Sequence, residues 1–191
     1  MNYLLRKIVS KLYGFFIRIE KQLLLNHYKI VNKNVVIDRT FQFERYFDLR
    51  VQNEHASFVI GKDVIIKNYC SFVVSKNGKL IVSDGVFMNK FCSINCMGEV
   101  YIGSNTLLGE GVRIYDHNHK YESKDELIKD QGYSIGSVRI GNNCWIGSNT
   151  IILNNVEIGD NVVIGANNLI YKSIPANQIV TAKHEFLQKE Y

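Results

Sequence analysis

An isoleucine recurs at every sixth position between residues 140 and 170. The positions are Ile140, Ile146, Ile152, Ile158, Ile164 and Ile170, and glycine directly follows four of them. An α-helix cannot have this period, because its turn contains about 3.6 residues. A six-residue repeat of one aliphatic side chain is typical of a parallel β-helix, in which each hexapeptide forms one short strand and one tight bend. We therefore predict an all-β protein whose isoleucines stack in a dry interior.

The repeat is less regular in the rest of the chain. It runs through residues 60–114, with interruptions at 76–79 and 93–101, and insertions in a solenoid leave the coils as corner loops. Residues 29–59 alternate apolar and polar side chains as half-buried strands do, but they lie outside the repeat, so we expect irregular first coils there. The longest interruption, 117–137, is polar and charged. We expect an extruded, functional loop at this point.

Residues 1–28 are predicted to form an amphipathic helix. Apolar residues recur at three- and four-residue intervals from Leu5 through Ile8 and Leu12 to Leu23, with lysines and arginines interleaved. These charges make the segment unsuited to span a membrane, and no small-residue cleavage site follows it. Two alternatives stay open. The helix lies on the inner face of a membrane as a peripheral contact, or it packs across the β-helix or a neighbouring subunit, which we favour.

Length and composition predict one β-helix domain with two flanking segments. The 191 residues include a single proline and no Ser- or Gly-rich linker. We divide the chain into a helix (1–28), the β-helix (29–177) and a tail with a short helix (178–191). The net charge of +5 is too mild for a nucleic-acid-binding protein. The four cysteines have neither zinc-site nor disulfide spacing, so we expect reduced thiols, buried at Cys70 and Cys144, and a cytoplasmic protein.

Three segments resemble a known family. They are residues 140–148 (Ile-Gly-Asn-Asn-Cys-Trp-Ile-Gly-Ser), 158–166 (Ile-Gly-Asp-Asn-Val-Val-Ile-Gly-Ala) and 172–175 (Lys-Ser-Ile-Pro). Together they resemble the hexapeptide acyltransferase superfamily, in particular its galactoside, maltose, xenobiotic and polysaccharide O-acetyltransferases. The resemblance implies a left-handed parallel β-helix, a homotrimer and acetyl-CoA as the acetyl donor. The left hand follows from the resemblance alone, because parallel crossovers are normally right-handed.

Acetyl transfer from a thioester needs one base to remove the proton of the attacking group, and histidine titrates in a suitable range. Of the five histidines, only His117 and His119 stand where a coil strand gives way to the long loop. The family's catalytic histidine stands at this point, so the resemblance implies His117 as the base. His119 is the alternative base or a substrate contact. Asp116 is a candidate for orienting the imidazole and stabilising its cation.

Two further residues are candidates for acceptor binding. Asn89 stands at the offset of the family's acceptor-binding asparagine, and an amide can both donate to and accept from a sugar hydroxyl. The alternative for Asn89 is an asparagine that only serves a bend. Trp145, the single tryptophan, directly follows an inward position, so we expect it to point outward and to line a cleft between subunits.

The resemblance also assigns residues to the donor. Ser148 falls at the thioester end, where its hydroxyl can stabilise an oxyanion, and Ala166 falls where the main chain approaches the pantetheine arm. Tyr171 and Lys172 stand where the family has Thr-Lys before Ile-Pro, so Lys172 is a candidate phosphate partner and Tyr171 departs from the pattern. The chain lacks the family's Gly-x-Pro-Ala motif over the nucleotide, and Lys183 and Lys189 are the candidate substitutes.

These assignments predict an acetyl-CoA-dependent O-acetyltransferase that needs no metal. The expected acceptor is a sugar of a cell-surface polysaccharide, such as a lipopolysaccharide O-antigen or a capsule, or its lipid-linked precursor. An N-acetyltransferase of an amino sugar nucleotide needs the same base and stays open. A zinc hydratase needs three converging histidines, and His117 and His119 are too close in sequence to supply its pattern. A non-catalytic β-helix scaffold is the remaining alternative, and failure to bind CoA would favour it.

Overall fold

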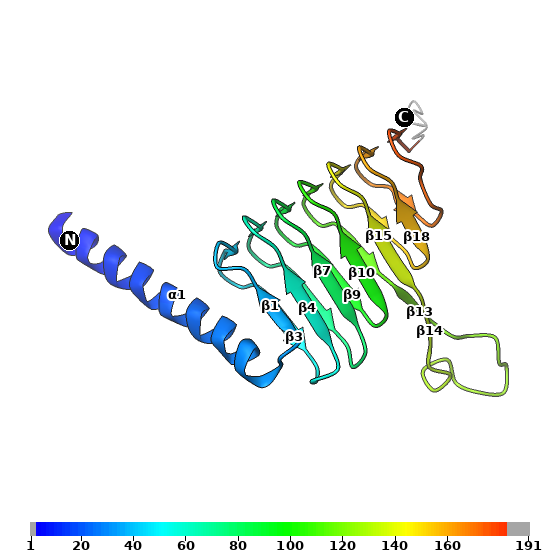
Figure 1. The fold of residues 1–191 in the computed structure, drawn as a ribbon, viewed down its shortest axis with the longest axis horizontal. Helices are drawn as coiled ribbons and strands as arrows, with labels where there is room; N and C mark the ends of the chain where they lie inside the picture. Colours follow the sequence, from blue (N-terminus) through cyan, green and yellow to red (C-terminus); the bar gives the residue numbers. More distant parts are fainter. Residues whose placement is uncertain (1–2, 183–191) are drawn as a thin grey trace, which may run out of the picture.

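The computed structural model describes residues 3–182, which form one long helix and a parallel β-helix (Figure 1). Helix α1 (Tyr3–Val31) comes first, and the coils of the β-helix then stack along one axis. Each coil contributes one short strand to each of three parallel sheets. The predicted parallel β-helix is therefore confirmed.

The three sheets share the same order along the axis. The first sheet contains β1 (Val35–Ile37), β4 (Ser57–Ile60), β7 (Lys79–Val82), β10 (Glu99–Ile102), β15 (Ser137–Ile140) and β18 (Val156–Ile158). The second sheet contains β2 (Gln42–Phe43), β5 (Ile65–Ile66), β8 (Phe87–Met88), β11 (Leu107–Leu108), β16 (Trp145–Ile146), β19 (Val163–Ile164) and β21 (Ile179–Val180). The third sheet contains β3 (Asp48–Val51), β6 (Ser71–Val74), β9 (Ser93–Cys96), β12 (Arg113–Tyr115), β17 (Ile151–Ile152) and β20 (Leu169–Ile170).

The repeated isoleucines form the core. All six isoleucines of the regular repeat are buried, and each lies directly above the matching residue of the previous coil, as Ile140 does above Ile102. Burying one such side chain contributes about 1.5–3 kcal/mol relative to leaving it in water. All four cysteines are also buried and free, as predicted for Cys70 and Cys144. The interior is therefore a continuous apolar column.

The bends between the first and second sheets explain the recurring asparagines. Asn105, Asn143, Asn161 and Asn177 have φ values between 53° and 62°, in the left-handed region that asparagine tolerates better than most residues. Their side chains also connect successive coils, since Asn143 donates to Asn161 (2.8 Å) and Asn161 donates to Asn177 (3.1 Å). Asparagine at this corner therefore serves both the bend and the stacking of coils.

The expectation of irregular first coils over residues 29–59 was wrong. Strands β1, β2 and β3 pair in parallel register with β4, β5 and β6. The six-residue spacing is present here as Ile37, Phe43 and Leu49, all buried, but only the first of them is an isoleucine. Phe41 and Phe43 stack with ring centroids 5.3 Å apart and fill the end of the interior. Phenylalanine thus replaces isoleucine where the coil interior begins.

Helix α1 packs on the β-helix near its C-terminal end, and Tyr13 near its middle also contacts Arg45 of the first coil. Leu24, Leu25 and Tyr28 pack against the first coils, whereas Leu12 and Phe16 are exposed. Asn32 fixes the exit from the helix, because its buried amide donates to the carbonyls of Asn53 (2.7 Å) and Ala56 (3.0 Å). The helix then projects away from the coils (Figure 1).

The exposed apolar side chains of the amphipathic helix α1 raise the question of a membrane. Within residues 3–182 no helix has both the length and the apolar character needed to cross a bilayer. Contact with a membrane surface and contact with a neighbouring subunit both stay predictions for the exposed part of α1.

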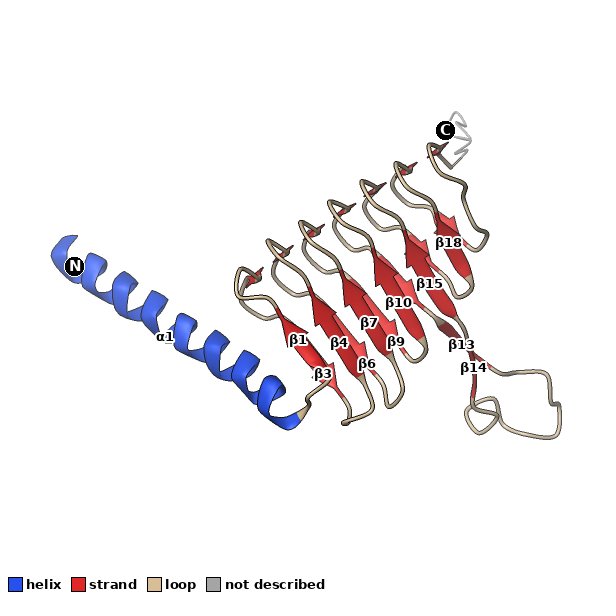
Figure 2. Ribbon diagram, in the orientation of Figure 1, coloured by secondary structure: helices blue, strands red, loops and turns tan. Residues whose placement is uncertain are grey.

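Over residues 32–182 the chain leaves the coils once, between β12 and β15. Strands β13 (His117–His119) and β14 (Tyr133–Ile135) form an antiparallel hairpin, and residues 120–132 extend beyond it (Figure 2). The predicted extruded loop is therefore present. Strand β21 pairs with β19, so strand pairing continues past residue 177 into the segment assigned to the tail. The short helix predicted in that tail lies beyond the described residues.

Candidate active site

The predicted base lies where the extruded hairpin begins. We call this place the third corner, where the chain turns from the third sheet to the first sheet of the next coil. His117 is the first residue of β13 and follows β12 by two residues. The main-chain carbonyl of Asp116 accepts a hydrogen bond from the amide of Gly136 (2.7 Å), which closes the base of the hairpin. The hairpin therefore fixes the backbone on both sides of His117.

Asp116 is a fully buried carboxylate with three hydrogen-bonding partners. Its oxygens accept from the main-chain amides of Met97 (2.9 Å) and Gly98 (2.8 Å), which belong to the preceding coil, and lie 2.9 Å from Nδ1 of His117. A buried charge is tolerated only when such bonds replace its hydration. The two amides hold the carboxylate, and the carboxylate holds the imidazole.

This arrangement determines which nitrogen of His117 is available. An ionised carboxylate only accepts hydrogen bonds, so the Nδ1 atom facing it carries the proton. In the neutral ring the lone pair then lies on Nε2. The His117 side chain is 17% exposed, so the imidazole is mostly sheltered but reachable. The geometry is suited to a general base whose role stays a prediction.

His119 lies further out on the same hairpin. It is exposed, and its ring centroid lies 4.5 Å from that of Tyr133 on the opposite strand. The Tyr133 ring also meets the His117 ring edge to face, with centroids 5.5 Å apart. Tyr133 therefore links the two histidines, and the sequence analysis did not find it. The signal available was the pairing of 117–119 with 133–135, which requires the hairpin register.

Three predicted residues share a different corner. We call this the second corner, between the second and third sheets, and it comprises residues 44–46, 67–69, 89–91, 109–111, 147–149 and 165–167. Asn89, Ser148 and Ala166 all lie in it, and main-chain bonds join its coils, such as Asn167 N–H to Ser148 O (2.8 Å). Asn89 accepts a bond from the amide of Lys90 (2.9 Å) through Oδ1, which leaves its NH₂ group for a ligand.

In the last coils, main-chain atoms form most of the surface of the second corner. A Cβ atom on Gly147 would lie 2.5 Å from the amide nitrogen of Ala166, and one on Gly109 would lie 2.6 Å from that of Ser148. Real Cβ atoms do not approach backbone so closely, so stacking of the coils alone requires glycine at these two positions. Gly165 differs, because its nearest neighbour would be 3.5 Å away. Ser148 and Ala166 therefore lie on a narrow, main-chain-rich surface.

Trp145 points outward, as predicted. It is 56% exposed on the outer face of the second sheet, where it pairs with Leu107 of the preceding coil, itself 47% exposed. An indole and an isobutyl group side by side in water form an apolar patch that favours contact with another surface.

The remaining donor residues lie at the other corner. Tyr171 and Lys172 directly follow β20 and are exposed at the third corner, two coils beyond His117, with Lys172 Nζ 5.7 Å from the centroid of the Tyr171 ring. Lys183 and Lys189 lie outside the described residues. The predicted site is thus divided within one chain. Asp116, His117 and Lys172 lie at the third corner, and the acceptor and thioester residues lie at the second.

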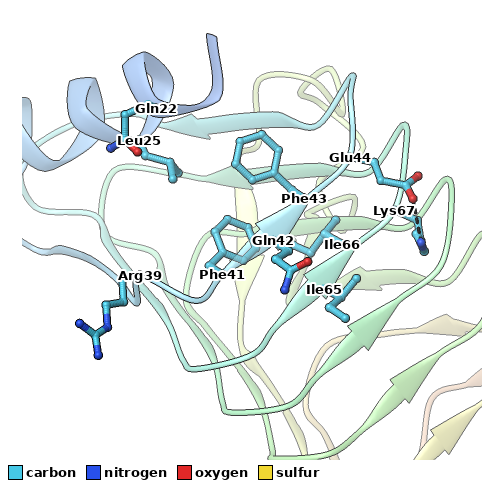
Figure 3. Close-up of a pocket in the computed structure, with 10 residues that line it drawn as sticks. All are labelled: Gln22, Leu25, Arg39, Phe41, Gln42, Phe43, Glu44, Ile65, Ile66 and Lys67. Carbon is cyan, nitrogen blue, oxygen red and sulfur yellow. Dashed lines mark hydrogen bonds and ion pairs between the residues drawn. The ribbon is translucent and has the colours of Figure 1, made fainter. Parts of the chain in front are cut away.

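A hollow at the N-terminal end contains none of the predicted site residues. It has a volume of about 500 Å³ and lies between α1 and strands β2 and β5 (Figure 3). Gln22 and Leu25 of the helix face Phe41 and Phe43, and the ion pair between Lys67 and Glu44 (2.7 Å) borders one side.

Two of the buried cysteines, Cys96 and Cys144, are poor nucleophiles. Burial raises the pKa of the Cys96 thiol, and the neighbouring Asp116 carboxylate raises it further. Burial also raises the pKa of Cys144. A thiol is reactive as its thiolate, so these two groups stay neutral and inert. Within residues 3–182, His, Cys, Asp and Glu side chains form no group of three or more that could bind a metal ion.

A family model matches the coils that contain the predicted donor-binding residues. The model, described as bacterial transferase hexapeptide (six repeats), matches residues 137–172. These residues contain strands β15 to β20, the two most regular coils.

Proteins of known description are similar over longer segments. A Mycobacterium tuberculosis protein named as an acetyltransferase is 26% identical over 129 residues, which cover 68% of this chain and 43% of its own length. The Escherichia coli protein WbbJ, named for O-acetyl transfer in lipopolysaccharide biosynthesis, is 28% identical over 121 residues, covering 60% of this chain and 62% of its own. The chain therefore spans about half the length of the curated relatives it matches.

Solved structures share the fold. A mutant of AntD, an N-acyltransferase from Bacillus cereus in complex with dTDP and coenzyme A, has a TM-score of 0.62 at 16% identity, covering 78% of this chain and 79% of that one. A maltose O-acetyltransferase from Clostridium difficile has a TM-score of 0.50 at 23% identity, covering 81% and 67%. At these identities the likeness concerns the fold alone.

Proposed function

Because this chain belongs to the hexapeptide-repeat acetyltransferase superfamily, we propose that it transfers an acetyl group from acetyl-CoA to a sugar hydroxyl. The acceptor we propose is a sugar of a cell-surface polysaccharide or of its lipid-linked precursor, and the similarity to WbbJ supports this class. The observation that carries the proposal is the hydrogen bond from His117 to the buried Asp116 at the base of the hairpin.

His117 acts as the general base. With Nδ1–H bonded to Asp116, the Nε2 lone pair removes the proton of the acceptor hydroxyl as its oxygen attacks the thioester carbonyl. The carbon–sulfur bond of the tetrahedral intermediate then breaks, which leaves the acetyl ester on the sugar. CoA departs as a thiolate and takes the proton from the imidazolium. Asp116 stabilises that imidazolium between the two steps.

The other predicted residues hold the substrates. Asn89 hydrogen-bonds the acceptor sugar through its NH₂ group, with Trp145 and His119 on the walls of the same cleft. The pantetheine arm lies along the main chain of the second corner, where Ala166 leaves room for it and Ser148 donates to the developing oxyanion. Lys172 binds a phosphate of CoA. Its neighbour Tyr171 stands where the family has threonine. This assignment places the reacting groups in one cleft.

Such a cleft requires more than one copy of the chain. The base lies at the third corner and the thioester residues lie at the second, with the third sheet between them. We therefore propose a homotrimer in which the second corner of one copy faces the third corner of the next. Trp145 and Leu107 gain a covering surface in this arrangement. Light scattering on the purified chain tests it, and a stable monomer at working concentration would contradict the shared site.

The cytoplasm is the compartment we propose. Four reduced cysteines suit a reducing environment, and acetyl-CoA is available there. Exposed apolar side chains along α1 leave peripheral contact with the inner face of the membrane open.

The activity is tested directly by following thiol release. Purified chain is supplied with acetyl-CoA and matched acceptors that carry either a hydroxyl or an amine at the same sugar position. We expect turnover with hydroxyl acceptors. Turnover with amines alone would replace O-acetylation by N-acetylation and keep the same base. No binding of CoA at millimolar concentration would overturn the enzymatic function and favour a scaffold.

A further inference from the structure

Three aromatic residues occupy the same place in the first three coils. Tyr46, Tyr69 and Phe91 are the last residues of the second-corner segments 44–46, 67–69 and 89–91, and we call them the aromatic column. Their φ values are 63°, 62° and 60°, in the left-handed region that disfavours side chains with a Cβ atom. Bulky residues adopt this conformation rarely, and such strain tends to occur at functional sites.

The later coils show which residue types suit this bend when the position has no other role. The equivalent residues there are Gly111, Asn149 and Asn167, also at positive φ. Glycine and asparagine adopt this conformation at lower cost than an aromatic residue. Aromatic residues in three successive coils are therefore unnecessary for the bend, and their rings require another explanation.

The rings form steps rather than a closed stack. Tyr46 and Tyr69 have centroids 5.0 Å apart and planes 5° apart, and Tyr69 and Phe91 have centroids 5.2 Å apart and planes 6° apart. Nearly parallel rings at this separation are offset, so each leaves part of its face in water. The three residues are accordingly 57%, 51% and 50% exposed. The column therefore presents a row of partly open aromatic faces.

The aromatic column is anchored to α1 at one end and lies beside Asn89 in sequence at the other. At one end the guanidinium of Arg45 lies between two rings, 5.0 Å from the Tyr46 centroid and 5.3 Å from that of Tyr13 in α1, and it donates to the Tyr13 hydroxyl. At the other end Phe91 follows Asn89 by two residues. The column thus runs from the candidate acceptor residue toward the N-terminal helix, in the direction opposite to Ser148 and Ala166.

Polar groups accompany the rings at the same corner. Lys67 pairs with Glu44 (2.7 Å), which also accepts from the amide of Asn68 (3.2 Å), and Arg45 and Lys90 stand at the same corner. Amide, ammonium and carboxylate groups beside aromatic faces suit a ligand that has both apolar faces and many hydroxyls.

We propose that the aromatic column binds the sugar rings of a glycan chain whose reacting residue lies at Asn89. The apolar face of a pyranose packs on an aromatic face while its hydroxyls bond the polar groups beside it. The step from one ring to the next is close to the length of one sugar residue along a chain. The proposal rests on the proposed function and narrows its acceptor to an oligosaccharide or polysaccharide rather than a single sugar.

The test replaces two of the three aromatic residues by asparagine. Tyr69→Asn and Phe91→Asn remove the ring and supply a residue that suits positive φ, so we expect folding to be retained. Asp63→Asn is the matched control, because Asp63 lies in the same coil as Tyr69, also at positive φ (53°), but at the opposite corner of the second sheet. Melting temperatures of all variants are compared with that of the unaltered chain.

Binding is measured by calorimetry without acetyl-CoA. The probes are malto-, chito- and lipopolysaccharide-derived oligosaccharide series, from single sugars to hexasaccharides. We expect affinity in at least one series to rise with chain length, and Tyr69→Asn to lower the hexasaccharide affinity about ten-fold while Asp63→Asn leaves it unchanged. Affinity that is independent of chain length in every series, or unaffected in the asparagine variants, would overturn the proposal.

A contact between copies of the chain is the competing explanation. If the asparagine variants lower the mass in solution and leave glycan affinity unchanged, the column is a subunit interface and the proposal is wrong. The two proposals also fail separately. Chain-length-dependent binding without acetyl transfer overturns only the enzymatic function, and acetyl transfer that ignores the column overturns only the glycan site.

Discussion

The third corner places the Asp116–His117 pair in one coil, whereas the second corner carries aromatic side chains in its first three coils and glycine-rich main chain in its later ones. Asp116 is fully buried and bonded to two amides of the preceding coil. The second corner instead offers Asn89 and glycine-rich main chain to a ligand. A proton acceptor needs one oriented group, while a long donor and a long acceptor need an extended surface. In the proposed function, catalysis and binding are therefore separated within one chain and meet only between copies.

Removing the imidazole is expected to have the largest effect. His117→Ala eliminates the proposed general base, and such bases contribute about 10²–10⁴-fold to rate. We expect kcat for acetyl transfer to fall within that range, with the mass in solution unchanged. His119→Ala is the control, because its ring lies on the same hairpin and is exposed. A larger loss of kcat in His119→Ala than in His117→Ala would assign the base to His119.

Changing the carboxylate is expected to have the second largest effect. In Asp116→Asn one carboxylate oxygen becomes an NH₂ group, which donates and cannot accept. The asparagine side chain therefore cannot satisfy Met97, Gly98 and His117 together. We expect kcat to fall about 10²-fold, since a misoriented base loses much of its contribution, while KM for acetyl-CoA stays unchanged. Urea unfolding should also show a loss of about 1–3 kcal/mol for the unsatisfied buried groups.

A purely structural role for Asp116 predicts a different pattern. Loss of stability with kcat intact at a temperature where the variant is folded would show that the carboxylate supports the corner but does not position the base. Tyr133→Phe is a useful comparison, because it keeps the ring contact with His117 and leaves every bond of Asp116 in place.

The second corner is tested by two glycines one coil apart. Gly147→Ala places a Cβ atom 2.5 Å from the Ala166 nitrogen, and we expect the free energy of unfolding to fall by about 1–3 kcal/mol as the coils separate. Gly165→Ala is the control, since its new Cβ meets only ordinary contacts at 3.5 Å. Chemical denaturation of both variants measures the difference. Equal stabilities would show that coil stacking does not require glycine there.

The sequence specified the coils better than it specified the site. Six isoleucines at constant spacing determine the register of the later coils, because only one alignment buries all of them. The first coil was predicted to be irregular since Phe43 and Leu49 keep the spacing but change the residue. The fold of the later half could therefore be read from local pattern, and the first coil required recognising any large apolar residue.

The site depends on contacts that a linear pattern does not contain. The amides that hold Asp116 come from Met97 and Gly98, one coil earlier, so no motif near His117 reveals them. The pairing of Tyr133 with His119 depends on the hairpin register. The aromatic column was equally hidden, because its members are one coil apart in space and differ in their neighbours along the chain.

The smallest effect is expected where the third corner meets the donor's phosphates. Lys172 is exposed at the end of the coils, and an exposed charge pair is worth about 0–1 kcal/mol. We therefore expect Lys172→Ala to raise KM for acetyl-CoA only about 2- to 5-fold, by the same energies, with kcat unchanged because His117 lies two coils away. The difference in KM between Lys172→Ala and the unaltered chain should vanish at high salt. Salt screens the exposed charge of Lys172, so the unaltered chain then loses the same contribution. Lys33→Ala, which removes an exposed lysine near the end of α1, is the control for net charge. An equal rise of KM in both variants would show that general charge, and not a phosphate contact at the third corner, attracts the donor.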